Sequence, residues 1–309
     1  MRWKRGNRLR LVSDVEASPR VREIFDEVCH SLGLPGVPTL YRAYAVYPEF
    51  LAVHWASFRP ALQSRQFFAL GARLAAESYT RAHNYFEIPS LTTYESHPAI
   101  APSLPIAQVL DYYQYLDPLL LLIASAQMQA FEGAIGRTGN AEVPNHPSFP
   151  VAPTLLPDEQ ASSTVQRIWD ERRRVLEVAF ISDEHRALAC WPDFYREYWS
   201  PLKSLLQSPL YADCQYRIGE SAWTMVQEIP VKVETGVSQL LEAGMNGEDL
   251  SSLARMNEAF MQAMTGLVLD ITFARIGCDG GTRGQSPPVH KSPTSTPRKK
   301  KAKSPTRAA

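Results

Sequence analysis

The segment Ser182-Asp183-Glu184-His185-Arg186-Ala187-Leu188 places a carboxylate at the start of an apolar stripe with helical spacing. A carboxylate in that position could act as a general base toward a water molecule. The structural alternative is that Asp183 caps the helix by accepting hydrogen bonds from backbone N–H groups of its first turn. One side chain can hold both roles, so Asp183 is a candidate base whose presence also has an ordinary explanation.

A second carboxylate stands in the segment Tyr112-Tyr113-Gln114-Tyr115-Leu116-Asp117-Pro118. Asp117 directly before Pro118 is typical of a helix cap followed by proline at the first helical position. The three tyrosines are more typical of packing at an interface than of a ligand pocket. Asp117 is therefore a second candidate site residue with a structural alternative.

Common catalytic signatures are absent from the sequence. There is no glycine-rich phosphate loop, no GxSxG and no HExxH motif. The seven histidines have no ligand spacing, and we interpret His54 and His185 as packing or surface groups. The four cysteines are scattered without a CxxC, which excludes a disulfide scaffold, a thioredoxin-like dithiol and a zinc ribbon.

The cysteine usage suits a reducing compartment. The longest apolar run and the first residues of the chain agree with this location. The longest apolar run, Leu119 to Ala124, is far shorter than the roughly 20 residues of a membrane span. Residues 1–11 lack the apolar stretch of a signal peptide. The sequence therefore predicts a soluble cytoplasmic protein with no membrane partner.

The formal net charge of zero hides an uneven distribution. The chain has 309 residues with 32 Lys and Arg against 32 Asp and Glu. Residues 1–10 carry five cations and residues 282–309 carry eight, with no acid in either segment, so residues 11–281 have a net charge of −13. The basic tail could contact nucleic acid through phosphates, but we favour a solvated extension, because the acidic body presents no basic face for such a partner.

The sequence contains an internal repeat with an offset of 144 residues. Residues 21–64 align without a gap to residues 165–208, with 14 identities in 44 positions. Composition alone would give roughly 5–8% identity. The offset is too long for a solenoid unit of about 20–50 residues, so it indicates a duplicated domain. Two such halves usually pack about a pseudo-twofold axis, and the groove between them is the natural place for a ligand.

Local signals are helical throughout, which predicts an all-α fold. Ser18-Pro19 is typical of a helix start, an apolar stripe follows, and Gly33 ends it. Further helices are predicted over residues 105–115, 118–135, 210–228, 232–243 and 248–276. The predicted organisation is a basic segment (1–14), a first helical repeat (15–135), a Pro- and Gly-rich linker (136–161), a second repeat (162–279) and a disordered basic tail (280–309).

Several motifs make the sequence similar to a known family. The second half begins with a sequence of the "TV/EVQ…I" type, and Ser182-Asp183 is followed by Ala187-Leu188-Ala189 and Trp191-Pro192. The other two motifs are the segment Asp117 to Leu122 and Leu269-Asp270-Ile271-Thr272. Over most of residues 15–279 the chain resembles the group I 2-haloacid dehalogenases, the type that accepts both D- and L-2-haloacids. That family is all-α, a covalent pseudo-dimer of two similar halves, each in the broad alkylhydroperoxidase-like class.

The resemblance implies a chemistry. An aspartate matching Asp183 would activate water, which attacks C2 of a 2-halocarboxylic acid directly and inverts it, without a covalent ester. Halide leaves and a 2-hydroxy acid forms, and no metal or organic cofactor is required. The family association also implies a homodimer, although the duplication already supplies a pseudo-dimer.

The resemblance also implies a pocket and departures from it. The family's water-positioning asparagine falls on Asp117, a threonine falls on Ser64, and the glutamate one turn later falls on Phe68. Family aromatics fall on Gly36 and Thr39, and a Tyr and a Phe fall on Met264 and Leu267. The expected site is thus Asp183 and Asp117, with substrate contacts at Ser64, Ser182, Thr39, Gly36, Leu120, Met264, Leu267 and Val268. So many changes suggest a different or bulkier substrate, or a binding protein that has lost the activity.

Overall fold

The computed structural model describes residues 9–92, 97–137, 147–176, 178 and 180–282, and within them it is built of helices. Their bounds are α1 (Pro19–Leu32), α2 (Thr39–Tyr44), α3 (Pro48–Leu62), α4 (Arg65–Tyr85), α5 (Ile106–Ala130), α6 (Ser163–Leu176), α7 (Asp183–Leu188), α8 (Pro192–Leu206), α9 (Pro209–Met225), α10 (Val237–Glu242) and α11 (Gly247–Cys278), with 3₁₀ turns at Asp158–Gln160 and Val226–Glu228. The extended pairing in these described ranges is one isolated bridge between Ile135 and Val233. The prediction of an all-α protein is confirmed.

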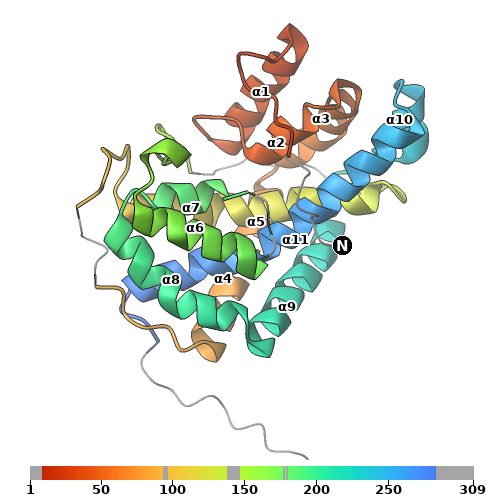
Figure 1. Cartoon of the computed structure of the whole chain (residues 1–309). Coiled ribbons are helices and arrows are strands. Elements are labelled where there is room, and N and C mark those ends of the chain that lie inside the picture. Colours follow the sequence, from red (N-terminus) through yellow and green to blue (C-terminus); the bar gives the residue numbers. More distant parts are fainter. Residues whose placement is uncertain (1–8, 93–96, 138–146, 177, 179, 283–309) are drawn as a thin grey trace, which may run out of the picture.

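The long helices α5 and α11 form the centre of the molecule. They share the most extensive helix–helix contact, and α4 and α9 pack against both. Figure 1 shows α1, α2 and α3 on one side of this central pair and α6, α7 and α8 on another. Gly71 allows α4 to approach α5 closely, because a Cβ atom there would lie 2.4 Å from Leu119 Cδ2. The centre is therefore a close-packed layer on which the shorter helices rest.

The helix α5 contradicts the cap expected at Asp117. Two helices were predicted on either side of Asp117-Pro118, but α5 runs without a break through both residues. Pro118 costs one backbone hydrogen bond inside the helix. The segment Leu116–Gln127 is buried on all its faces, and that burial of apolar surface offsets the lost bond.

Helices of the two halves occur at positions that differ by 144. The starts of α2 and α7, α3 and α8, and α4 and α9 differ by that number. Local contacts follow the same offset: Trp55 Nε1 donates to Glu27 Oε2, and Trp199 Nε1 donates to Glu171 Oε2 at 2.9 Å. Ser18 and Ser162 each accept from a backbone N–H three residues later, at 3.3 Å. These pairs agree with the interpretation of two homologous repeats, which stays a prediction.

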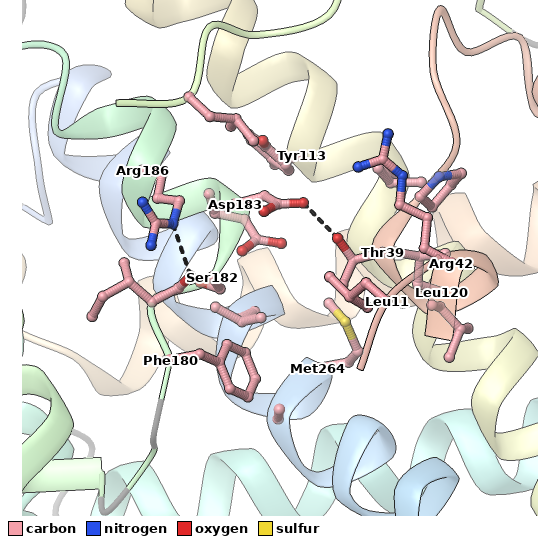
Figure 2. A pocket seen from close by; sticks show the side chains of 18 of the residues that line it. Leu11, Thr39, Arg42, Tyr113, Leu120, Phe180, Ser182, Asp183, Arg186 and Met264 are labelled. Atoms are coloured by element: carbon pink, nitrogen blue, oxygen red, sulfur yellow. Dashed lines mark hydrogen bonds between the residues drawn. The ribbon is translucent and has the colours of Figure 1, made fainter. Parts of the chain in front are cut away.

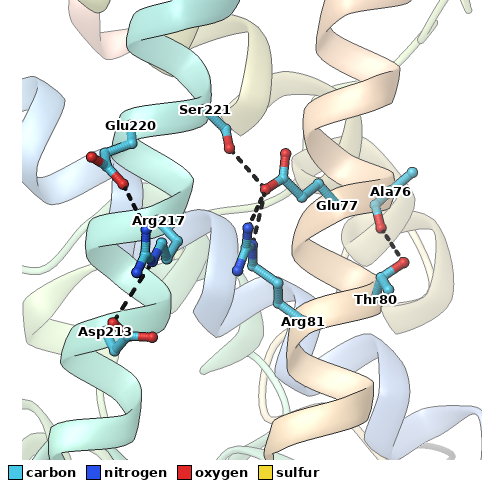
Figure 3. Close-up of polar contacts among 8 residues, drawn as sticks. All are labelled: Ala76, Glu77, Thr80, Arg81, Asp213, Arg217, Glu220 and Ser221. Atoms are coloured by element: carbon cyan, nitrogen blue, oxygen red, sulfur yellow. Dashed lines mark hydrogen bonds and ion pairs between the residues drawn. The ribbon is translucent and has the colours of Figure 1, made fainter.

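Residues related by the same offset also meet each other. Ser221 Oγ on α9 donates to Glu77 Oε1 on α4 at 2.8 Å, beside the Arg81 guanidinium that also binds Glu77 (Figure 3). Thr39 Oγ1 donates to Asp183 Oδ2 at 2.7 Å. Contacts between equivalent positions are expected on a pseudo-twofold axis, where each residue faces its own counterpart.

The chain ends differ in part from the expected segments. Residues 1–8 of the basic start, 138–146 of the linker and 283–309 of the tail lie outside the described residues. Thr282 was assigned to the tail, but its N–H donates to the Ile88 carbonyl at 2.9 Å, and its hydroxyl accepts from Ile88 N–H at 2.8 Å. Gly281 has φ +76° and packs against the same segment, a conformation that favours glycine. The packed body therefore extends to residue 282.

The helix α11 is long and apolar enough to cross a membrane, judged by length and hydropathy alone. Of its most apolar window, 67% is buried inside the protein, and α5, α4, α9 and α8 cover it. This burial is that of a core helix.

A buried ion pair ties the second half to α11. Arg172 on α6 donates to Asp270 Oδ2 at 3.0 Å, and Tyr211 OH donates to Asp270 Oδ1 at 2.7 Å. Burial alone would raise the pKa of Asp270, but the Arg172 charge and the His185 contact hold it below the ordinary value. Burial, followed by the Arg172 charge, lowers the pKa of His185 to about 4, so this imidazole is neutral and packs in the core.

We predict that Asp270→Asn lowers the free energy of unfolding by about 3 kcal/mol, because it leaves the buried Arg172 guanidinium without its counter-charge. Urea denaturation measures the change. Asp170→Asn is the matched control: it breaks the exposed pair with Arg173 and should change stability by less than about 1 kcal/mol. Equal effects of the two substitutions would contradict the role assigned to the buried pair.

Candidate active site

A cavity of about 700 Å³ lies where the two halves meet. Its walls come from α2 and the loop before it, from α5, α7 and α11, and from two irregular segments at residues 9–11 and 152–158. Figure 2 shows Asp183 near its centre, with Thr39 facing it and Phe180 and Met264 below them in this view. The cavity thus has side chains from both predicted halves, as expected for a groove between them.

Asp183 is the first residue of α7 and lines the cavity. The residue at the cap position is Ser182, whose side chain makes no capping hydrogen bond. The Asp183 carboxylate instead accepts the Thr39 hydroxyl across the cavity at 2.7 Å. The alternative in which Asp183 serves as the helix cap is therefore wrong, and one of its oxygens is held in place by the opposite half.

Glu184 lines the cavity beside Asp183, and Asp117 is fully buried next to Glu184. The Asp117 and Glu184 carboxyl groups are close enough for a hydrogen bond between them when one of them is protonated. Burial and the neighbouring Glu184 charge raise the pKa of Asp117 well above its ordinary value. Burial and the charge of Asp183 raise the pKa of Glu184 to about 7. The surroundings therefore favour the protonated form of Asp117, and Glu184 titrates near pH 7.

Three arginines line the cavity and differ in how they are engaged. Arg186 pairs with Asp158 at 2.7 Å, donates to two backbone carbonyls and lies over the Trp169 ring. Arg173 pairs with Asp170 at 3.0 Å. Arg42 has only a 3.6 Å approach to Asp14, and its buried Nε has no partner among the described residues. Arg42 is thus the cavity cation with the most capacity left for an anion.

The expected contact residues separate into two groups. Those that line the cavity are Gly36, Thr39, Leu120, Ser182, Asp183, Met264 and Leu267. Three others lie outside the lining. Ser64 is the N-cap of α4, Val268 is buried on α11, and Asp117 is buried on α5. Ser64 is occupied by accepting the Gln66 N–H at 3.2 Å, which leaves it no role at this cavity.

Two functional candidates were missed by the sequence interpretation. Glu184 was passed over beside Asp183, although its position at the start of a short helix in a groove could have marked it. Arg42 aligns with Arg186 in the repeat, and that match was a signal for a pair of cations flanking the groove. Figure 2 shows the two arginines on opposite sides of Asp183.

Polar groups cluster beside Asp183. Among the described residues, Arg42 Nε is a buried donor without a hydrogen-bond partner, whereas the side chains of Ser182 and Asp117 are close enough to Glu184 to hydrogen-bond with it. A buried donor without a partner is costly unless water or a ligand satisfies it. Within the same residues, no group of three or more His, Cys, Asp or Glu side chains is arranged to hold a metal ion. The arrangement suits a polar ligand and water beside a carboxylate base.

Comparisons with known proteins point to one family. A family model described as halocarboxylic acid dehydrogenase DehI matches residues 35–185, which include Gly36, Thr39 and Asp183. An (R)-2-haloacid dehalogenase of Pseudomonas putida is 24% identical over 85% of this chain and 91% of its own length. One from Rhizobium sp. (strain NHG3) is 20% identical over 72% of this chain and 88% of its own length.

Solved structures have the same fold. A crystal structure of a D-2-haloacid dehalogenase mutant superposes with a TM-score of 0.78 at 21% identity, covering 90% of this chain and 98% of its own. A complex of D-2-haloacid dehalogenase with L-LA gives a TM-score of 0.77 at 22% identity, covering 90% and 99%. In sequence and in fold, this chain is therefore similar to the 2-haloacid dehalogenases.

Proposed function

We propose that this protein is a hydrolase that removes halide from a 2-halocarboxylic acid, with Asp183 as the general base. The observation that carries the proposal is the Asp183 carboxylate, which lines a cavity and is oriented by Thr39 rather than used as a helix cap. The match to the halocarboxylic acid dehydrogenase DehI model and the similarity to (R)-2-haloacid dehalogenases support the reaction class.

The proposed step is direct attack by water. Asp183 accepts a proton from a water molecule as the water oxygen forms a bond to C2. The carbon–halogen bond breaks on the opposite side, the halide takes the bonding electrons, and C2 is inverted. The products are a 2-hydroxy acid, a halide ion and a proton that Asp183 then releases to solvent. The Thr39 hydrogen bond fixes one carboxylate oxygen, so that the other can face the water.

Arg42 is proposed to hold the substrate carboxylate. It lines the same cavity, it stands one turn after Thr39 on α2, and its buried Nε is unpartnered among the described residues. A guanidinium binds a carboxylate through charge-assisted and often bidentate hydrogen bonds. With the carboxylate held at α2, C2 is placed toward Asp183 at the start of α7.

Asp117 is proposed to act as a neutral group in place of the family's asparagine. Burial and Glu184 raise the pKa of Asp117 and so favour its protonated form, which carries an O–H donor and a carbonyl acceptor, as a primary amide carries both functions. In this form it adds no charge to a site that receives an anion. The competing hypothesis of a binding protein without activity is not favoured, because the base retains both a cavity and an orienting partner.

We predict that Asp183→Asn lowers kcat for halide release by at least about 100-fold, the usual contribution of a general base. Halide release is to be measured with both enantiomers of 2-chloropropionate and 2-bromopropionate. Asp193→Asn, which removes one partner of the exposed ion pair with Arg196 on α8 and lies outside the cavity lining, is the control and should retain activity. Unchanged release in Asp183→Asn would rule out the mechanism, and no release from any 2-haloacid by the native protein would contradict the function.

We predict that KM for a 2-haloacid rises as the pH increases through about 7, because Glu184 then gains a negative charge beside an anionic substrate. In Glu184→Gln the KM should not change across that interval. Asp117→Asn should keep most of the native kcat, since the raised pKa of Asp117 favours a protonated carboxyl that an amide can replace. Steady-state kinetics between pH 5.5 and 8.5 decide both expectations, and a loss in Asp117→Asn as deep as in Asp183→Asn would show that Asp117 acts as a charged base.

We predict that Arg42→Gln raises KM roughly 10- to 100-fold, the loss expected for a hydrogen bond to a charged group, with a smaller effect on kcat. Arg42→Lys should recover part of the loss, because it restores the positive charge but not the planar guanidinium that donates two parallel hydrogen bonds. Arg173→Gln removes a cation from the cavity rim that is already paired, and it serves as the matched control. Similar KM values in all three variants would show that the carboxylate binds elsewhere.

A further inference from the structure

The cavity is much larger than the smallest 2-haloacids. A 2-halopropionate has six non-hydrogen atoms, and at about 30 Å³ for each, the volume share of a water molecule, it needs about 180 Å³. The cavity measures about 700 Å³, which is in the range of pockets that enclose drug-sized ligands. A 2-halopropionate bound at Asp183 would therefore leave most of the space to water.

Much of the cavity wall is apolar. Asp183, Ser182 and Glu184 stand together at the start of α7, and Arg42 also lines the cavity from α2. Apolar side chains come from α5, α11 and the segments beside α2 and α7, among them Val37, Leu116, Leu120, Phe180, Phe260 and Met264. Water against apolar walls has few polar partners, and an apolar ligand group that displaces it gains free energy.

Gly36 leaves part of this space open. It lines the cavity, and a Cβ atom built on it would meet no atom within 4 Å. Its φ lies outside the left-handed region, so the backbone does not require glycine there. The absent side chain therefore enlarges the cavity rather than relieving backbone strain.

Two partly exposed leucines belong to the cavity lining. Leu11 and Leu155 both line it, both are 39% exposed, and their positions differ by 144 residues. The segments that carry them are bound at equivalent places, by Val12 N–H to the Arg42 carbonyl at 3.0 Å and by Leu156 N–H to the Arg186 carbonyl at 3.2 Å. Apolar side chains that both line a cavity and reach the surface suit an apolar ligand chain that extends toward solvent.

We propose that the substrates are 2-haloacids with a long or bulky apolar group at C3, such as an alkyl chain of several carbons or an aryl group. The carboxylate and C2 lie between Arg42 and Asp183, and the apolar group fills the space beside Gly36 and extends toward Leu11 and Leu155. This inference rests on the proposed function for its chemistry, but it concerns the volume and polarity of the cavity.

The test compares halide release from 2-bromopropionate, 2-bromohexanoate and 2-bromo-3-phenylpropionate, each as separate enantiomers. Three additional buried methylenes should raise kcat/KM at least about tenfold from propionate to hexanoate. Gly36→Trp, which fills the open space, should reduce the ratio of hexanoate to propionate kcat/KM at least about tenfold. Gly133→Trp is the matched control, because Gly133 also has open space around it but does not line the cavity, and the ratio should stay as in the native protein.

Binding measurements keep this inference separate from the catalytic proposal. The affinities of the native protein for 2-hydroxypropionate and 2-hydroxyhexanoate are measured by calorimetry. If propionate is turned over as well as the longer acids, the proposed substrate class is wrong while the dehalogenase function stands. If no acid releases halide, the function fails, and tighter binding of 2-hydroxyhexanoate still supports the apolar subsite. Equal affinities, or no binding of either acid, would then overturn it.

Discussion

The packing of α5 along α11 sets the geometry of the site. Both helices are buried through most of their length, and each contributes to the cavity wall, Leu116 and Leu120 from α5 and Met264 and Leu267 from α11. The short helices α2 and α7 reach the same cavity from different halves. Because α7 packs on α5, a change of core volume in this close-packed centre would move Asp183 relative to the rest of the cavity.

The contact between Thr39 and Asp183 links the fold to the chemistry. The two residues hold equivalent positions in the repeat, and they meet as Glu77 and Ser221 meet on the neighbouring helix pair. In a symmetric dimer, two identical residues would face each other at such a place. Here one half supplies a carboxylate and the other supplies a hydroxyl that orients it. Duplication followed by divergence is the interpretation we favour, since it lets one copy carry the base and the other support it.

The sequence predicted the fold class well because the apolar periodicity and the caps act locally. Ser18, for example, accepts the N–H that its position indicated. It failed at Asp117-Pro118, where a strong local signal for a helix start was overridden by burial on every face of α5. It placed Asp183 at a cavity but missed Arg42 and Glu184. Their importance depends on which buried atoms lack hydrogen-bond partners and which charges lie nearby. Residue spacing in the sequence predicts neither of these properties.

The remaining question is how an acidic body accommodates an anionic substrate. Residues 11–281 carry a net charge of −13, so the overall field opposes the approach of an anion. Within the cavity the balance differs: the surroundings favour the protonated form of Asp117, Glu184 is only partly ionised near pH 7, and three arginines stand in the walls. Desolvation, which raises the pKa values of these two carboxyl groups, also strengthens the attraction of Arg42 for a bound carboxylate. Burial thus reduces the repulsion and increases the attraction at the same place. Asp183 is less buried than these two neighbours and is hydrogen-bonded by Thr39, so the site combines one accessible carboxyl group with two buried ones.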